Sequence, residues 1–206
     1  VSLNNATTIG GGMYISKASD VSSTPIIFNS TVVYNTSAVL GSGLLCTNQT
    51  NPVVQNSIFW GNLAADGVQM HLQGSSEIFV TYSDVAGGVS GIVGFDDIIY
   101  QNNIDQSPDF TDGDAENYSL LITSPCIDAG NPNAPYDPDG TVPDMGAYYF
   151  DFSDYGCTDQ SACNYDASKT IDDGSCQSND CAGVCGGSAE NDACGECNGN
   201  NIDCSP

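Results

Sequence analysis

The sequence predicts an all-β protein in which the coils of a parallel β-helix (a solenoid) precede a small, loop-dominated segment held by disulfides. Three observations predict this fold. The first half repeats with a period of 26–27 residues, its short apolar runs are separated by Gly and Asn without helical periodicity, and cysteines crowd the end of the chain. We place the β-helix in residues 1–152 and the acidic, cysteine-rich segment in 153–206.

The repeat is clearest in two segments of the first half. TPIIFNSTVVYN from Thr24 aligns with NPVVQNSIFWGN from Asn51 at a constant offset of 27, and a weaker copy from Glu77 follows at 26. A period of this length is typical of solenoids, in which each repeat buries its apolar face only against its neighbours. The identical pairs at offset 27 are Pro25/Pro52, Asn29/Asn56, Ser30/Ser57 and Asn35/Asn62.

The repeat also predicts how side chains stack from one coil to the next. Val32, Phe59 and Val85 occupy equivalent positions and should form one interior column. Asn29 and Asn56 should face inward and stack as a ladder of side-chain amides. An antiparallel sandwich is the alternative fold, but its turn signals would come about every 8–12 residues, without identities at a 26–27-residue offset.

The end of the chain cannot build a hydrophobic core. Large aliphatic side chains are scarce from Tyr155 onward, so disulfides must offset an ordering entropy of about 1–2 kcal/mol per residue. A zinc site is the alternative because Cys194 and Cys197 form a CxxC, yet the only histidine, His71, lies far upstream. We expect eight cysteines to pair with one another, in a pattern that the sequence leaves open: Cys157, Cys163, Cys176, Cys181, Cys185, Cys194, Cys197 and Cys204.

The two remaining cysteines, Cys46 and Cys126, lie in the predicted β-helix. We expect each to be a separate, buried, small apolar side chain rather than half of a disulfide. Disulfides in the tail are typical of proteins that mature in an oxidising compartment.

The charge balance excludes several classes of partner. The chain has 26 acidic residues against two basic ones, Lys17 and Lys169. Nothing can neutralise phosphates, which excludes nucleic acids and anionic membrane surfaces as partners. No stretch approaches the roughly 20 apolar residues of a membrane span, so we expect no membrane insertion. Such a density of acids repels itself unless cations bind among them.

A calcium site is the cofactor that this acidity suggests. Asp137-Pro138-Asp139-Gly140 offers carboxylates two residues apart beside a glycine that permits a sharp turn, and Asp144 follows closely. Oxygen ligands in such loops suit calcium. We therefore expect Asp137, Asp139 and Asp144 to be ligands, although ordinary solvated turns explain the same pattern equally well.

Catalytic candidates are weak. Glycoside hydrolysis needs two carboxylates roughly 5–9.5 Å apart, but the available acids lie among turn residues rather than at adjacent strand positions. His71 has no evident acid or nucleophile beside it, and Trp60 is expected to pack rather than to bind sugar. We therefore expect no enzymatic activity. The acids considered are Asp109, Asp112, Asp114, Glu116, Asp137, Asp139 and Asp144.

Several motifs carry a family resemblance. NSIFWGN, TYSDV, YSL...SPCIDAG and D.DG..PDMGAY resemble the carboxy-terminal coils of right-handed β-helix proteins of the pectate-lyase-like superfamily, although Tyr149 stands where glutamate is usual. The tail is similar to cysteine-rich repeats of surface and type IX-secreted proteins of marine Bacteroidetes and their relatives. The resemblance implies a right-handed helix and an extracellular or cell-surface location. Lyases of this fold use arginine or lysine, and the chain has no arginine.

These features favour a non-enzymatic structural or adhesive module, such as a rod-like component of a surface fibre, stabilised by calcium. A carbohydrate-binding or polysaccharide-degrading β-helix of the glycoside hydrolase type is the alternative. Because no capping element precedes the first coil, NNATTIGGGMYIS, we expect partners at that end. Head-to-tail self-association is the partner interaction we favour, and another extracellular protein or a glycan is the alternative.

Overall fold

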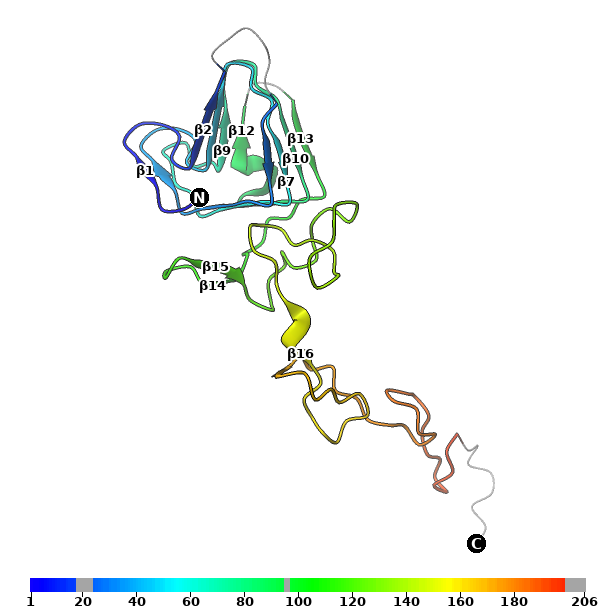
Figure 1. Ribbon diagram of the computed structural model, residues 1–206. Helices are drawn as coiled ribbons and strands as arrows, with labels where there is room; N and C mark the ends of the chain where they lie inside the picture. The colour runs from blue at the N-terminus through cyan, green and yellow to red at the C-terminus, as the bar shows by residue number, and fades with distance from the viewer. Residues whose placement is uncertain (18–23, 95–96, 199–206) are drawn as a thin grey trace. The chain divides into compact units, whose positions relative to one another are not determined.

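The computed structural model describes residues 1–17, 24–94 and 97–198 (Figure 1). The chain divides into two compact units, Val1–Phe150 and Asp151–Pro206. The described residues form β-strands, two short 3-10 helices and turns, so the fold is all-β, as the sequence predicts. No helix among them is long and apolar enough to cross a membrane.

The first unit contains three parallel sheets, and consecutive strands of the chain lie in successive sheets. The β2 sheet comprises β2 (Met13–Ser16), β6 (Leu44–Thr47), β9 (Met70–Leu72) and β12 (Ile92–Val93). The β3 sheet comprises β3 (Ile26–Phe28), β7 (Val53–Gln55), β10 (Ile78–Thr81) and β13 (Ile98–Gln101). The β4 sheet comprises β4 (Thr31–Val33), β8 (Ile58–Trp60) and β11 (Asp84–Val85). A small parallel pair, β1 (Asn5–Ala6) with β5 (Thr36–Ser37), lies outside them.

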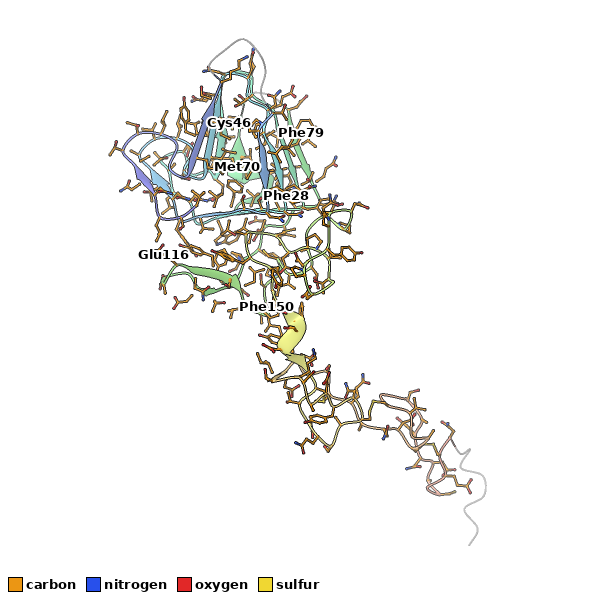
Figure 2. The ribbon with its side chains drawn as sticks, viewed as in Figure 1. Phe28, Cys46, Met70, Phe79, Glu116 and Phe150 are labelled. Atoms are coloured by element: carbon orange, nitrogen blue, oxygen red, sulfur yellow. A yellow bond between two sulfur atoms is a disulfide. The ribbon has the colours of Figure 1, made fainter. Side chains whose placement is uncertain are left out.

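The core lies between the three sheets and is built from equivalent positions of successive repeats. Val32 pairs with Phe59, and Phe59 with Val85, and all three side chains are completely buried in one cluster. The predicted interior column is therefore confirmed. Cys46 and Met70 belong to the same cluster, contributed by the β2 sheet (Figure 2). Alternation along each short strand sends every second side chain into this core.

The predicted asparagine ladder is wrong in its position. Asn29 and Asn56 have positive φ angles of 43° and 48° at the turns that follow β3 and β7. Asparagine tolerates this left-handed conformation better than most residues. Asn29 is exposed rather than interior, and the Asn56 side chain turns outward to accept a hydrogen bond from Asn131 N at 2.8 Å.

The second pair of repeated asparagines forms the ladder instead. Asn4 Nδ2 donates to Asn35 Oδ1 at 2.8 Å, and Asn35 Nδ2 donates to Asn62 Oδ1 at 2.9 Å. Asn62 Nδ2 then donates to Gln69 Oε1 at 2.8 Å. At each step the backbone N–H of the same asparagine also donates to the same oxygen, at 3.0–3.2 Å. In these six bonds the donor belongs to the earlier residue and the side-chain oxygen that accepts belongs to the later one.

Within the described residues of the first unit, the parallel pairing ends with the bridge between Asp84 and Ile104. The expectation that parallel coils extend to residue 152 is therefore wrong, because β14 (Phe110–Asp112) and β15 (Asn117–Leu120) pair antiparallel. The segment 105–150 instead lies on the outward side of the β4 sheet. It forms there a second buried cluster, whose members are Val33, Ile58, Tyr118, Leu120, Cys126 and Met145.

The second unit has almost no apolar interior. It begins with the 3-10 helix η2 (Phe152–Asp154) and contains one small parallel pair, β16 (Tyr155–Gly156) with β17 (Ile171–Asp172). Cys157 is the one buried residue among those described in this unit. Disulfides and turn hydrogen bonds therefore replace a core, as the scarcity of aliphatic residues predicts.

Candidate functional sites

The three predicted calcium ligands lie in one loop, where their oxygens accept hydrogen bonds from the chain. Asp137 Oδ2 accepts from Asp144 N at 2.8 Å, and Asp139 Oδ1 accepts from Thr141 Oγ1 at 2.8 Å. Asp144 accepts from the backbone N–H groups of Asp128, at 2.7 Å, and Phe150. These bonds hold together the segment that contains the PDMGAY motif.

The electrostatics of this loop are unfavourable for three ionised carboxylates. Burial, together with the carboxylates of Asp137 and Asp128, raises the pKa of Asp144 to about 6, although the hydrogen bonds from Asp128 N and Phe150 N lower it. Burial also raises the pKa of Asp137. Within residues 1–17, 24–94 and 97–198, no three His, Cys, Asp or Glu side chains are arranged to hold a metal ion. Calcium binding by Asp137, Asp139 and Asp144 stays a prediction.

A buried carboxylate that the sequence interpretation missed lies on β11. Asp84 is completely buried, with Oδ1 accepting from Gln106 N at 3.3 Å and Oδ2 accepting from Cys126 Sγ at 3.5 Å. Burial raises the pKa of Asp84 to about 7 and also raises the pKa of the Cys126 thiol. This pair joins the β4 sheet to the segment that covers it. The sequence repeat could have revealed this buried carboxylate, because it aligns Asp84 with the apolar Ile58.

His71 has an acidic partner, contrary to the expectation from the sequence. Its Nδ1 lies 2.8 Å from Asp66 Oδ2, and both side chains are largely buried. Asp66 also accepts a hydrogen bond from Gly41 N at 3.2 Å, which ties this pair to the preceding repeat. Within the described part of the chain, no hydroxyl or thiol hydrogen-bonds to His71, so no nucleophile completes a catalytic arrangement.

Three of the seven acids considered for glycoside hydrolysis lie on the β14–β15 hairpin. Asp112, Asp114 and Glu116 are exposed there, and Asp112 Oδ1 accepts from Ala115 N at 3.1 Å as a turn residue. Trp60 packs against the cluster on the outward side of the β4 sheet, which confirms the packing role expected for it.

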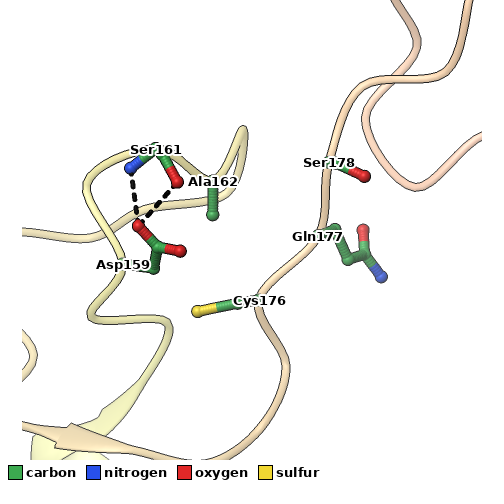
Figure 3. A pocket seen from close by; sticks show the side chains of 6 residues that line it. All are labelled: Asp159, Ser161, Ala162, Cys176, Gln177 and Ser178. Carbon is green, nitrogen blue, oxygen red and sulfur yellow. Dashed lines mark hydrogen bonds between the residues drawn. The ribbon is translucent and has the colours of Figure 1, made fainter.

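A shallow pocket of about 200 Å³ lies in the second unit (Figure 3). Asp159 Oδ1 accepts from Ser161 N at 2.8 Å and from Ser161 Oγ at 2.7 Å, and these hydrogen bonds lower the pKa of Asp159. A carboxylate with a lowered pKa is a poor base for activating a serine. The neighbouring Cys176 is bonded to Cys157 and offers no thiol. The lining residues are Asp159, Ser161, Ala162, Cys176, Gln177 and Ser178.

Acidic residues of the second unit form turns in a regular way. Asp180 Oδ1 accepts from Ala182 N at 2.9 Å and Val184 N at 2.8 Å, and twelve residues later Asp192 Oδ1 makes the equivalent bonds to Cys194 N and Glu196 N. Aspartate favours such turns because its side chain accepts from the backbone two residues onward. Much of the acidity of the tail therefore has a structural role.

The cysteines of the second unit form disulfides. The pairs are Cys157–Cys176, Cys163–Cys185 and Cys181–Cys197. Cys194 is also disulfide-bonded, which excludes a CxxC zinc site, and the remaining predicted cysteine, Cys204, lies outside the described residues. Cys46 and Cys126 are unpaired and buried, as predicted. Three disulfides indicate an oxidising environment of the extracellular type.

The comparisons with known proteins identify no relative. No protein family, no curated protein and no solved structure matches the chain.

Proposed function

We propose that the chain is a non-enzymatic extracellular structural module, serving as a rod-like spacer in a surface or fibre protein. In this proposal, the first unit forms the last coils of a right-handed parallel β-helix of the pectate-lyase-like type. The support is the strand order: consecutive strands lie in successive parallel sheets, and each pairs with the strand one repeat later, such as Val54 with Val80. The handedness and the surface location rest on the resemblance of the sequence motifs.

The observation that carries the structural role is the linkage of the three disulfide loops. Cys163 lies inside the loop closed by Cys157–Cys176, and Cys181 lies inside the loop closed by Cys163–Cys185. The loop closed by Cys181–Cys197 continues the series. A pulling force along this segment passes through disulfides and bypasses most of the backbone, so the segment resists extension. That property suits a spacer under load.

The outward faces of the parallel sheets also support a non-enzymatic role. Asp84 is the one carboxylate on the described strands of the β2, β3 and β4 sheets, and it is buried beneath residues 105–150. Glycoside hydrolysis requires two carboxylates flanking one bond, so these strands supply no such pair.

Single-molecule pulling on the chain, with attachment points at its two ends, tests this proposal. With the disulfides intact, the segment from Cys157 to Cys197 should contribute little extension. The Cys157–Cys176 and Cys181–Cys197 loops span 19 and 16 positions, so reduction should add roughly 120 Å of contour length, at about 3.4 Å per residue.

The matched control is the double variant Cys157→Ser/Cys176→Ser. Cys163–Cys185 then carries the load, so the path keeps ten backbone positions in place of five, and this variant should show only about 17 Å of the extension before reduction. An unchanged contour length after reduction would contradict the load-bearing role. Release of reducing sugars from a polysaccharide panel by the purified chain would favour the glycoside hydrolase alternative.

A further inference from the structure

Three parts of the first unit lie at the edge formed by its earliest strands. They are β2, β3 and Asn4, the first member of the asparagine ladder. Within the described residues, β2 and β3 are the outermost strands of their sheets, each paired on one side only (Figure 1). Met13 and Ile15 are only partly buried, although they pack against the main core. Ile27 is almost completely buried in that core.

The backbone of these strands has hydrogen-bonding groups that face away from their neighbours. Met13 N donates to Gly43 O at 2.9 Å, and Asn29 N donates to Gln55 O at 3.2 Å, so these residues face the next strand. In a parallel sheet, alternate residues of a strand direct both N–H and C=O to opposite neighbours. Tyr14 and Ser16 in β2, with Ile26 and Phe28 in β3, therefore direct theirs to the open side.

The direction of the hydrogen bonds in the asparagine ladder specifies which side chain can bind to Asn4 at this edge. Asn4 donates its backbone N–H and one Nδ2–H to Asn35 Oδ1, and no described residue donates to Asn4 Oδ1. An occupant that continues the pattern brings a backbone N–H and a side-chain amide to this oxygen, as Asn35 does for Asn62. That requires an asparagine at the ladder position of a preceding strand turn.

We infer that the β2–β3–Asn4 edge is a docking surface for one further β-coil with the same 26–27-residue repeat and an asparagine at the ladder position. This inference rests on the β-helix proposed above. The occupant adds one parallel strand to β2 and one to β3, covers Met13 and Ile15, and donates to Asn4 Oδ1.

A second copy of the chain fits this surface less well. The other end of the ladder stops at Gln69, whose Oε1 accepts from Asn62 and whose Nε2 donates to Asn62 O at 3.2 Å. The equivalent position of the following repeat is Gly88, which has no side-chain amide. A copy docked head to tail would therefore leave Asn4 Oδ1 without its donor, whereas a coil carrying asparagine supplies it.

The test adds such a coil to the chain itself. Ser2 pairs with Val33, so Val1 occupies the position of Val32 and of Phe59. A chain extended before Val1 by a copy of residues 32–58 therefore places the copied Asn35 over Asn4 and the copied β6 and β7 over β2 and β3. The matched control is the same extension with Asn35→Ala in the copy.

We expect the extension to raise the melting temperature by several degrees and to slow hydrogen exchange at the amides of Tyr14, Ser16, Ile26 and Phe28 by at least tenfold. The Asn35→Ala copy should give a smaller rise. Unchanged exchange at these four amides, with β6 and β8 still protected, would overturn the docking inference while leaving the β-helix intact. Loss of protection in β6 and β8 of the unextended chain would instead contradict the β-helix.

Light scattering of the unextended chain supplies the second measurement. A monomer in which the same four amides exchange quickly supports the inference. Concentration-dependent head-to-tail oligomers that protect these amides would show that a second copy is the occupant, and would overturn it.

Discussion

Gly146 N donates a hydrogen bond to Asn56 O at 2.8 Å, joining the PDMGAY motif to the turn after β7. Gly146 has a φ of +107°, and a Cβ at this position would lie 2.9 Å from Ile58 Cδ1 and 3.0 Å from Thr31 Oγ1. Both the backbone conformation and the close approach to the β4 sheet therefore require glycine here.

Gly146→Ala should loosen residues 105–150 from the β4 sheet and lower the free energy of unfolding. Backbone strain alone costs about 1–3 kcal/mol, and the contact with Ile58 adds to it. Gly140→Ala is the control, because Gly140 has a similar φ of +89° but open space around its Cβ position. Thermal unfolding should show a larger loss for Gly146→Ala, and equal losses would contradict the close approach.

Phe59→Ala should be among the most destabilising single substitutions in the first unit. Phe59 is completely buried between Val32 and Val85, and truncating such a side chain costs about 3–5 kcal/mol. Phe28→Ala removes a 40% exposed phenylalanine from an outward position and should cost much less. Chemical denaturation of both variants measures the difference, and similar costs would mean that the interior column is misplaced.

The repeat period was enough to predict the strands, their parallel stacking and this column, because each depends on positions 26–27 residues apart. It could not distinguish the two repeated asparagine pairs, which have the same offset. Asn35 and Asn62 face inward, whereas the left-handed backbone at Asn29 and Asn56 turns those side chains away.

The packing of residues 105–150 was not predictable from the repeat, since it depends on contacts between distant, non-periodic positions. The bond between Asn131 N and Asn56 Oδ1 spans 75 positions, and that between Ala147 N and Thr31 Oγ1 spans 116. The His71–Asp66 pair was missed for a local reason. The turn between them contains Gly67 with a φ of +72°, and it brings the two side chains together.

Stability should fall as the pH rises from about 4 to about 7, because burial raises the pKa of Asp84 to about 7. A carboxyl group with a folded-state pKa above its unfolded value of about 3.9 contributes stability below that value, and this stability is lost as pH rises through the folded-state pKa. The groups around Asp84 supply no cation: the hydrogen bonds from Gln106 N and Cys126 Sγ lower its pKa, and the Asp105 carboxylate acts with burial to raise it.

The melting temperature should therefore be higher at pH 5 than at pH 8. Asp84→Asn imitates the protonated acid, so the variant should lose the change in melting temperature near pH 7. The change near pH 6, which comes from Asp144 and its pKa of about 6, should remain. Glu77→Gln changes an exposed acid and is the control. An unaltered pH profile in Asp84→Asn would contradict the burial of an ionisable group there.

The two unpaired cysteines should resist alkylation in the folded chain. Both are completely buried, and burial raises the pKa of Cys46 to about 11, so its reactive thiolate is scarce at neutral pH. Mass mapping without reduction should find Cys157–Cys176, Cys163–Cys185 and Cys181–Cys197 as linked peptides. Modification of Cys46 or Cys126 without denaturant would show that the core opens readily.

Calcium should stabilise the first unit if the Asp137–Asp144 loop binds it. Asp128 and Asp137 raise the pKa of Asp144, and Asp139 raises that of Asp137, so these carboxylates repel one another in the folded chain. A divalent cation would remove that repulsion and would stabilise the folded state by about 2.7 kcal/mol at a concentration 100-fold above its dissociation constant. Their hydrogen bonds to the backbone use only some of the lone pairs of the oxygens, which leaves others for a cation.

We expect millimolar calcium to raise the melting temperature above that in chelator by several degrees. Asp139→Asn keeps an oxygen for the hydrogen bond to Thr141 but removes one charge, so it should reduce the calcium effect without unfolding the loop. Glu77→Gln again controls for general screening of the negative charge, because its effect on calcium dependence should be small. Equal melting temperatures in calcium and in chelator would mean that Asp137, Asp139 and Asp144 serve as turn-forming acceptors. The stability of this loop would then come from the hydrogen bonds that Asp137 and Asp144 accept from the backbone.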